Sequence, residues 1–336
     1  MNVIEFDHKH SAHCESGVMS SMLRHYGLDL SEPMVFGLSS ALTFAYLPFL
    51  KMGGMPLVAY RSMPKSIIKN IQKNLNVKMK LETFSNKKKG EDRLDELLAE
   101  GKIVGVQTSV YWLPYFPDEM RFHFNAHNLL VFGKDKDGYN ISDPVFEFTQ
   151  KCDKASLSKA RFVKGAMAPK GLLYYPLSVP KDIDLKPIIL KSIKKVAKSM
   201  LKTPVPIAGL KGIFYLAKSI RKLKAKDKRY AKLFLGHIVR MQEEIGTGGA
   251  GFRYLYASFL REAAKIYDED KTLIQASDML LKVGDEFRDF ALMVAKAVKS
   301  KKPIHYDDIA DKLEYIASQE KKVYQKLLEF CEKNKK

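Results

Sequence analysis

Residues 127–143 read HNLLVFGKDKDGYNISD, with short apolar or alternating runs on either side of the polar stretch KDKDG. This pattern predicts a β-hairpin with strands over 127–133 and 139–143. His127 opens the first strand and Asp143 ends the second, so antiparallel pairing can place both side chains at one end of a sheet. The sequence therefore predicts a β-sheet that carries a histidine and a carboxylate at one end.

Cys14 lies in the stretch HSAHCESGVMS, directly before an expected helix over 17–27. A thiol there lies at the positive end of the helix dipole, and neighbouring imidazoles also favour the thiolate. A carboxylate can hold an imidazole in one tautomer while its other ring nitrogen faces such a sulfur. The order Cys14, His127, Asp143 is that of papain-like enzymes. The alternative is a buried, inert thiol, with a structural histidine and a common turn at Asp143.

The first half of the chain mixes strands and helices, whereas the second half is helical. Further strands are expected over 103–110 and 171–180, and helices from Ser31 on, over 65–75 and over 92–101. After about residue 180 only helical patterns follow, and 336 residues are more than one core usually serves. We therefore expect an α+β, papain-like domain over 1–180 and an all-helical domain over 181–336.

Cysteine usage and the N-terminal residues bear on metal binding and compartment. The chain holds three cysteines, Cys14, Cys152 and Cys331. Their odd number, wide spacing and lack of a CxxC pair argue against a disulfide framework and a zinc site. His8, His10 and His13 have no clear metal-ligand spacing, so no metal is expected. MNVIEFDHKH lacks the features of a signal peptide and no apolar run is long enough to span a bilayer, so we expect a cytoplasmic protein.

Positive charge is concentrated in one block of the chain. The net charge is +19, and residues 181–240 hold 17 Lys and Arg against 3 Asp and Glu. Such a block attracts an acidic protein, an anionic membrane or a nucleic acid. Ile189, Ile193, Val196 and Met200 fall at helical spacing, with Lys191, Lys194, Lys195 and Lys198 on other faces. These lysines could dock a carrier protein or an anionic membrane, or they could form the solvated face of a core-packed helix. The sequence has no nucleic-acid recognition motif, so a nucleic-acid partner is not expected.

The sequence resembles the butirosin biosynthesis protein H-like acyltransferases, which have a papain-like cysteine fold. The resemblance in the N-terminal domain lies in HCESGVMSSMLRHYGLDLSEPMVFGLSSALTFAY, GGMPLVAYR, VYWLPYFP and AHNLLVFGKDKDGYNISDP. The stretch EEIGTGGAGFRYLYASFLREAA, residues 243–264, is similar to the helical domain that commonly follows. The resemblance thus covers nearly the whole chain.

This resemblance implies that a cysteine takes an acyl group from the thioester of an acyl carrier protein and passes it to an amine or hydroxyl acceptor. Carried over by position, Cys14 would be the nucleophile, His127 the base and Asp143 the orienting carboxylate. It implies no bound cofactor, since the acyl-phosphopantetheine of the carrier is the donor. Carrier proteins are acidic, so the basic domain would dock one. A lipid acceptor would add peripheral contact with the inner face of the membrane.

Several further residues are candidates for binding roles. The backbone N–H of Cys14 is one expected oxyanion donor, and His13, Gln107 and Asn128 are candidates for the second. Tyr111, Trp112, Tyr115 and Phe116 would line an acyl pocket or are ordinary core and loop aromatics. In GTGGAGFR, Gly248 and Gly249 would let the backbone approach a substrate, with Arg253 as an anion clamp; otherwise the stretch is a helix break.

Two other classes of function remain open. A cysteine peptidase or amidase would use the same residues, and only a product that depends on an acceptor separates it from a transferase. A non-catalytic basic scaffold that binds membrane or nucleic acid would keep its function after Cys14→Ala, and salt would abolish its binding.

Overall fold

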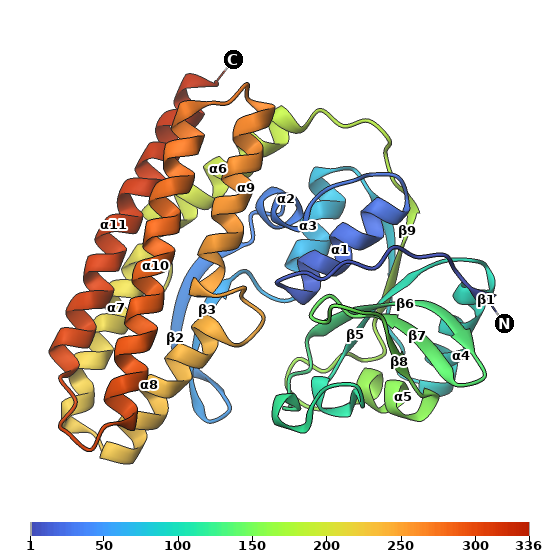
Figure 1. Ribbon diagram of the computed structural model, residues 1–336, viewed down its shortest axis with the longest axis horizontal. Helices are drawn as coiled ribbons and strands as arrows, with labels where there is room; N and C mark the ends of the chain where they lie inside the picture. Colours follow the sequence, from blue (N-terminus) through green and yellow to red (C-terminus); the bar gives the residue numbers. More distant parts are fainter. Residues whose placement is uncertain (1, 336) are drawn as a thin grey trace. The chain divides into compact units, whose positions relative to one another are not determined.

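The computed structural model describes residues 2–335 and divides the chain into two units. The first comprises the residues before Phe36 together with Ile67–Ile183, and the second comprises Phe36–Ser66 and the residues from Asp184 on. The first is an α+β region and the second is largely helical (Figure 1). The expected fold class, an α+β domain followed by a helical one, is confirmed.

An antiparallel sheet forms the centre of the first unit, in the strand order β4-β9-β5-β6-β7-β8, with β1 also paired to β6. Its strands are β1 (Asn2–Val3), β4 (Lys78–Glu82), β5 (Val104–Thr108), β6 (His127–Asp135), β7 (Gly138–Ser142), β8 (Gln150–Cys152) and β9 (Leu173–Ser178). The helices before Ile183 are α1 (Cys14–His25), α2 (Glu32–Leu38), α3 (Ser66–Asn74), α4 (Lys87–Ala99) and α5 (Lys154–Phe162). Helix α1 packs on β6, and Figure 1 shows α4 and α5 on the other side of the sheet.

The predicted hairpin of residues 127–143 is formed by β6 and β7. Asp135 pairs with Gly138 across the turn, so β6 runs two residues further than expected. The first seven residues of β6 are buried, because this central strand is covered on both faces. Leu129 and Val131 point into a core that also contains apolar residues of α4 and α5. This burial holds the end of the hairpin, where His127 lies, in a fixed place.

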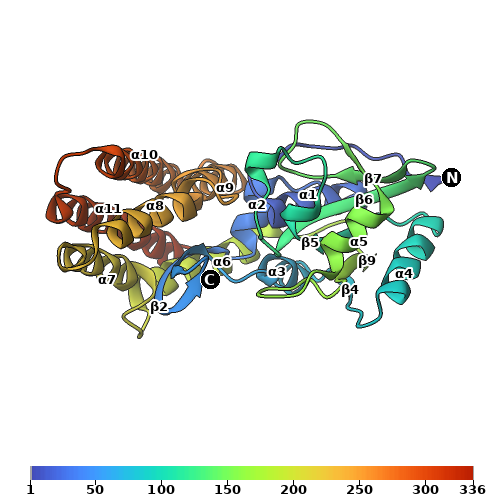
Figure 2. The ribbon, with the colours of Figure 1, turned by 90° about the horizontal axis from the view of Figure 1, so that it is seen from below.

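The second unit is built from long helices and one β-hairpin. Its elements are β2 (Leu42–Met52), β3 (Met55–Arg61), α6 (Leu185–Lys202), α7 (Gly209–Arg221), α8 (Lys228–Glu243), α9 (Arg253–Ile266), α10 (Lys271–Lys299) and α11 (Tyr306–Lys333). Figures 1 and 2 show α7, α10 and α11 running side by side. Strand β2 packs on α7, and β3 packs on α8.

The two units differ from the expected domains, which placed all of 1–180 together. Two strands alone cannot bury an apolar face, so β2 and β3 need helices to cover them. Tyr46 of β2 packs between Tyr215 of α7 and Phe234 of α8, at ring distances of 5.4 and 6.1 Å. The hairpin therefore belongs to the helical unit, although it precedes most of the sheet in the sequence.

A buried ion pair lies in the core of the helical unit. The Nε of Arg253 donates to Glu320 Oε1 at 3.0 Å, Nη2 donates to Oε2 at 3.2 Å, and both side chains are 0% exposed. Nη1 donates to the carbonyl of Gly251 at 2.8 Å, and the Phe287 ring lies 4.7 Å from the guanidinium. The structure thus corrects the expectation that Arg253 clamps a substrate anion, because its donors are used within the core.

We expect Arg253→Met to lower the free energy of unfolding by about 3–5 kcal/mol, because it leaves the Glu320 carboxylate buried without its cation. Arg253→Met combined with Glu320→Leu should recover most of the loss, since no buried charge then remains unpaired. Denaturant unfolding followed by circular dichroism measures both.

Arg261→Met is the matched control on the same helix. Arg261 pairs with Asp278, but the two side chains are 43% and 50% exposed. Its loss should change the free energy of unfolding by less than about 1 kcal/mol. An Arg253→Met variant as stable as this control would contradict the account of the buried pair.

Candidate active site

Cys14 is the first residue of α1, three residues earlier than the expected start of the helix. The preceding residue, His13, has an extended backbone, with φ −137° and ψ 134°. The side chain of Cys14 is therefore placed at the positive end of the dipole of a helix of 12 residues. Cys14 is only 5% exposed.

His127 and Asp143 meet at the end of the predicted hairpin. His127 is the first residue of β6 and pairs with Thr108 of β5, while Asp143 directly follows β7. The Nε2 of His127 donates to Asp143 Oδ2 at 2.7 Å, and both residues are buried. This leaves Nδ1 as the ring nitrogen for the hydrogen bond between the imidazole and Cys14. The structure thus brings all three predicted residues together.

The pKa of His127 reflects these two neighbours. Burial alone would lower it, but the Asp143 carboxylate and the hydrogen bond to Cys14 raise the pKa of His127 from 6.5 to about 10. A pKa at this level keeps the His127 imidazole protonated at neutral pH. Because the folded-state value is the higher one, the stabilisation is complete below pH 6.5 and is lost as the pH rises through about 10.

The two aromatic residues that follow Pro114 support the histidine and aspartate. The hydroxyl of Tyr115 donates to Asp143 Oδ2 at 2.9 Å, and the backbone N–H of Val145 donates to Oδ1 at 3.2 Å. Burial, and then the nearby Asp143 charge, raise the pKa of Tyr115 well above its usual value, so it stays a donor. Phe116 places its ring edge-on to His127, 5.5 Å away. Both residues were candidates for an acyl pocket or for ordinary packing, and in the structure they contact Asp143 and His127.

The other aromatic candidates lie at the surface. Tyr111 and Trp112 are 40% and 36% exposed. Tyr111 stacks on His123 at 4.2 Å, and the ammonium of Lys159 lies 5.3 Å from the Trp112 ring. Neither contact involves His127 or Asp143.

The oxyanion candidates have different environments. Gln107 uses both amide N–H groups, which donate to the carbonyls of Asn125 at 2.8 Å and Met167 at 3.2 Å. The structure therefore leaves Gln107 no donor for an oxyanion, and its role is to hold these loops. Asn128 donates to the Ala126 carbonyl at 3.1 Å through one of its two N–H groups. Asn128 and His13, the residue before the helix, remain candidates.

Glu32 is a residue of this site that the sequence reasoning missed. Its Oε2 accepts from the backbone N–H of Ala12 at 2.8 Å, and its Oε1 accepts from the N–H of His13 at 2.8 Å. The hydroxyl of Ser16 also donates to Oε1, at 2.9 Å. One carboxylate thus accepts hydrogen bonds from residues that precede Cys14 and from one that follows it. The signal was present in GLDLSE, where Glu32 follows the helix-capping Ser31, but nothing in that pattern connects it to residue 14.

Burial raises the pKa of Glu32, although the hydrogen bonds from Ala12, Ser16 and His13 counteract this effect. A carboxylate is the side chain that accepts from three donors without offering a proton of its own. The desolvation cost is therefore offset by contacts that position the segment around Cys14.

A second set of contacts joins the segment before Cys14 to the segment that carries Asp143. The N–H of Ser11 donates to the Pro144 carbonyl at 2.7 Å. The ring of His8 contacts Ser142 Oγ at 2.7 Å and donates to the Phe146 carbonyl at 3.0 Å. The segments that carry Cys14 and Asp143 are thus joined through these contacts as well as through His127.

Gly17 allows this close approach of α1. A Cβ at Gly17 would lie 2.6 Å from Ser11 Cβ and 2.8 Å from Pro144 Cβ, closer than real Cβ atoms come. Glu15, also in α1, accepts from the N–H groups of Ile67 and Ile68 at 3.0 and 3.3 Å. It thereby fixes α1 to the start of α3.

In the helical unit, the two glycine candidates lie in a turn and the candidate lysines lie on a packed helix. Gly248 and Gly249 have φ angles of 65° and 85°, which favour glycine, and the Gly249 N–H donates to Thr247 Oγ1 at 3.1 Å. The apolar side of α6 is buried, as Ile189, Ile193, Val196 and Met200 show. Of its lysines, Lys191, Lys195 and Lys198 are exposed and Lys194 is half-buried. Helix α6 is thus a core helix with a basic outer face, not a free amphipathic one.

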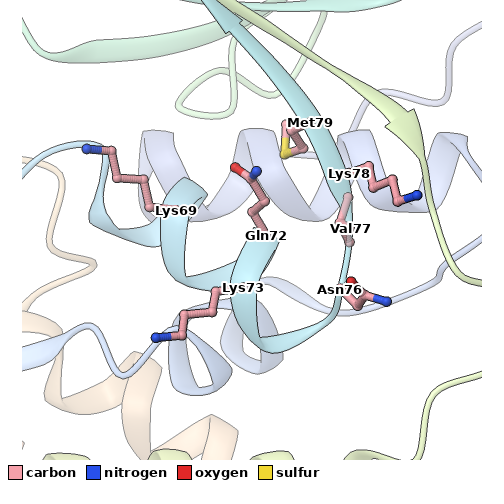
Figure 3. Close-up of a pocket in the computed structure, with 7 residues that line it drawn as sticks. All are labelled: Lys69, Gln72, Lys73, Asn76, Val77, Lys78 and Met79. Atoms are coloured by element: carbon pink, nitrogen blue, oxygen red, sulfur yellow. The ribbon is translucent and has the colours of Figure 1, made fainter.

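A cavity of about 550 Å³ lies between α3 and β4, away from these residues. It is lined by Lys69, Gln72, Lys73, Asn76, Val77, Lys78 and Met79. Figure 3 shows Lys69 and Lys73 pointing to one side and Lys78 to the other, so the three ammonium groups do not converge.

Within residues 2–335, no group of three His, Cys, Asp or Glu side chains is placed to hold a metal ion. No helix in that range is both long and apolar enough to cross a membrane.

Comparison with known proteins gives two family matches. The profile described as Butirosin biosynthesis protein H, N-terminal, matches residues 13–144, which include Cys14, His127 and Asp143. The profile described as Domain of unknown function (DUF4872) matches residues 155–327, more than half of the chain. A solved structure from Bacillus anthracis, described as a C39-like peptidase, is similar with a TM-score of 0.37 and 14% identity, over 53% of this chain and 98% of that one. None of the curated proteins matches.

We expect Glu32→Gln to slow the alkylation of Cys14 by iodoacetamide about tenfold or more. The amide offers one oxygen and places an N–H₂ against a backbone donor, so the segment around Cys14 shifts, and small shifts of a reacting group have large effects on rate. The rate is followed by intact mass spectrometry.

Glu15→Gln is the matched control. Glu15 is also buried and also accepts from two backbone N–H groups, but these belong to α3 rather than to the residues beside Cys14. It should affect stability more than the alkylation rate. A folded Glu32→Gln protein that reacts as fast as the wild type would show that Glu32 does not position the nucleophile.

Proposed function

From the premise that the chain belongs to the DUF4872 family and carries a butirosin biosynthesis protein H N-terminal domain, we propose that it is a cysteine-dependent acyltransferase. In the proposed reaction, Cys14 takes an acyl group from the thioester of an acyl carrier protein. It then passes this group to an amine or hydroxyl acceptor.

The observation that carries this proposal is the position of the His127 imidazole between Asp143 and Cys14. A buried carboxylate that binds one ring nitrogen keeps the imidazole oriented and protonated. The other ring nitrogen then faces the sulfur, which lies at a helix N-terminus. Both features favour the thiolate, the reactive form of cysteine.

The reaction proceeds in two transfers at the same sulfur. The Cys14 thiolate attacks the thioester carbonyl, the carbon–sulfur bond to the carrier breaks, and His127 gives its proton to the departing phosphopantetheine thiolate. The acceptor then loses a proton to His127 and attacks the acyl-enzyme, which releases the product and the Cys14 thiolate. The backbone N–H of Cys14 stabilises the oxyanion in both steps.

Hydrolysis differs from transfer only in the group that attacks the acyl-enzyme. A papain-like peptidase or amidase would use water at this step. The exposed fractions of Cys14 and His127, 5% and 4%, favour transfer, because limited access of water protects an acyl-enzyme until an acceptor binds.

The proposed donor is an acidic protein, and the helical unit offers it a basic surface. Lys191, Lys195 and Lys198 are exposed on α6, and the chain as a whole carries a net charge of +19. Complementary charge accelerates the encounter of two proteins and aligns them before contact. The α6 lysines therefore support a carrier protein as the partner.

The proposal is tested by intact mass spectrometry after mixing the protein with a panel of acyl-loaded carrier proteins. We expect a mass increase equal to one acyl group, which disappears in Cys14→Ala and is released when the correct acceptor is added. The acyl-enzyme is expected because the thioester and the Cys14 adduct have similar energies.

Cys152→Ala is the matched control, since burial raises the pKa of this thiol to about 12 and keeps it unreactive. It should acquire the same adduct as the wild type. An adduct that Cys14→Ala retains would overturn the assignment of the nucleophile. Failure of every donor to acylate a Cys14 that reacts with iodoacetamide would favour the peptidase or scaffold alternatives.

A further inference from the structure

The tip of the β2–β3 hairpin presents two large apolar side chains to solvent. Phe49 is 70% exposed and Leu50 is 49% exposed. Leu47 pairs with Leu57 and Lys51 pairs with Pro56, so the three residues 48–50 have no counterpart on β3. Such a bulge directs side chains away from the sheet. Phe49 and Leu50 therefore project from the ladder instead of packing on it.

Two glycines, Gly53 and Gly54, form the turn that follows this bulge. Gly53 and Gly54 have φ angles of 60° and 82°, as in the tight turn that joins two strands. A Cβ built on either glycine would meet no described atom within 4 Å. The hairpin tip thus has open space at both glycines, next to the exposed Phe49 and Leu50.

The C-terminal end of α7 and the N-terminal part of α8 lie beside this tip. Near the start of α7, a Cβ on Gly212 would lie 3.2 Å from the Phe44 ring. Further along α7, Tyr215 packs on Tyr46, which is closer to the tip. Helix α7 therefore runs parallel to β2, toward the tip. His237 contacts the carbonyl of Pro56, near the tip.

Helix α8 begins at the tip end of the hairpin. Gln242 lies 3.4 Å from the Tyr60 hydroxyl, further from the tip than the His237 contact. Helix α8 therefore runs away from the tip, and its first turns lie at the tip end. Leu233, one turn before His237, is 53% exposed there.

The connection between α7 and α8 adds a cluster of positive charge at the same end. Its exposed basic residues are Lys222, Lys224, Lys226, Lys228 and Arg229. The acidic residue within it, Asp227, accepts from the Tyr230 N–H at 2.9 Å as a helix cap. Arg221 is excluded from this cluster, because Asp307, Asp311 and Glu314 of the neighbouring α11 neutralise it.

We propose that this hairpin end, defined by Phe49, Leu50, Lys51 and Leu233 with the basic cluster 222–229, docks the protein on an anionic membrane surface. The apolar tip enters the boundary between headgroups and acyl chains, while the basic cluster faces the anionic headgroups. An acidic protein would satisfy the lysines, but the projecting Phe49 and Leu50 would gain less from a polar surface. This inference does not depend on the acyltransferase proposal.

The basic face of α6 is less suited to this role. The buried side of α6 holds its apolar residues, so that helix offers a membrane charge alone. Lipid attraction by charge is weak unless apolar side chains also insert. The hairpin end combines both properties, which favours it as the membrane contact.

The test is co-flotation of the full chain with vesicles of phosphatidylcholine that contain about one third phosphatidylglycerol. We expect binding to these vesicles, little binding to pure phosphatidylcholine, and weaker binding at high salt because the charges are screened. Phe49→Ser with Leu50→Ser should lower the affinity about tenfold or more. Both positions are exposed, so the fold should be unaffected.

Phe148→Ser with Leu177→Ser is the matched control. These residues of the first unit are equally apolar and are 71% and 60% exposed. The control should bind vesicles like the wild type. Equal losses in the two double variants, or no preference of the wild type for the anionic vesicles, would overturn the proposal.

A direct readout of insertion uses Phe49→Trp in a Trp112→Phe background, because Trp112 is the single tryptophan of the chain. Brominated lipids should quench the emission of this residue, and vesicles should shift it to shorter wavelength. A variant that binds vesicles without quenching would contradict insertion of the tip. Binding of an acidic carrier protein at the tip, without vesicle binding, would assign the surface to a protein instead.

Discussion

The buried contact between His127 Nε2 and Asp143 Oδ2, 2.7 Å long, is the interaction on which the proposed chemistry depends. It determines which ring nitrogen is left for Cys14, and it holds the imidazole in its charged form although burial opposes this. A charged group in such a place is costly unless its partner is close and well hydrogen-bonded. Tyr115 and the N–H of Val145 supply those bonds to Asp143, so the carboxylate remains an acceptor in a buried setting.

Other contacts in the first unit hold Cys14 in place beside His127 and Asp143. The central position of β6 fixes His127, and α1 packs on the same strand. Glu32 binds the segment on both sides of the cysteine, and the contact from Ser11 to Pro144 joins that segment to the one that carries Asp143. The segment around Cys14 is thus positioned largely by backbone contacts. The helical unit contributes a basic surface, and its buried Arg253 and Glu320 serve its own core.

Local patterns in the sequence were sufficient for the parts that depend on neighbours along the chain. The alternation around KDKDG predicted the β6–β7 hairpin, and the position of Cys14 before an amphipathic run predicted a helix N-terminus. The role of Glu32 was beyond such reasoning, because its contacts depend on how the loop before α2 folds back on residue 14. For Tyr115 and Arg253 both substrate contact and a structural role stayed open, since an aromatic loop and a glycine-rich break look alike in sequence whether they bind a ligand or a buried partner. The β2–β3 hairpin, which ends at Arg61, was missed because its apolar face is covered by helices far along the chain, of which α7 begins only at Gly209.

The protonation state of His127 tests the central claim most directly. Nuclear magnetic resonance of the wild-type protein with labelled histidine rings reports the charge of each imidazole as the pH is raised. The account predicts that the His127 ring stays charged through neutral pH and loses its proton near pH 10, and that Asp143→Asn removes this behaviour. A His127 ring that titrates at or below its ordinary pKa of 6.5 in the wild type would contradict a charged imidazole held by Asp143 beside Cys14.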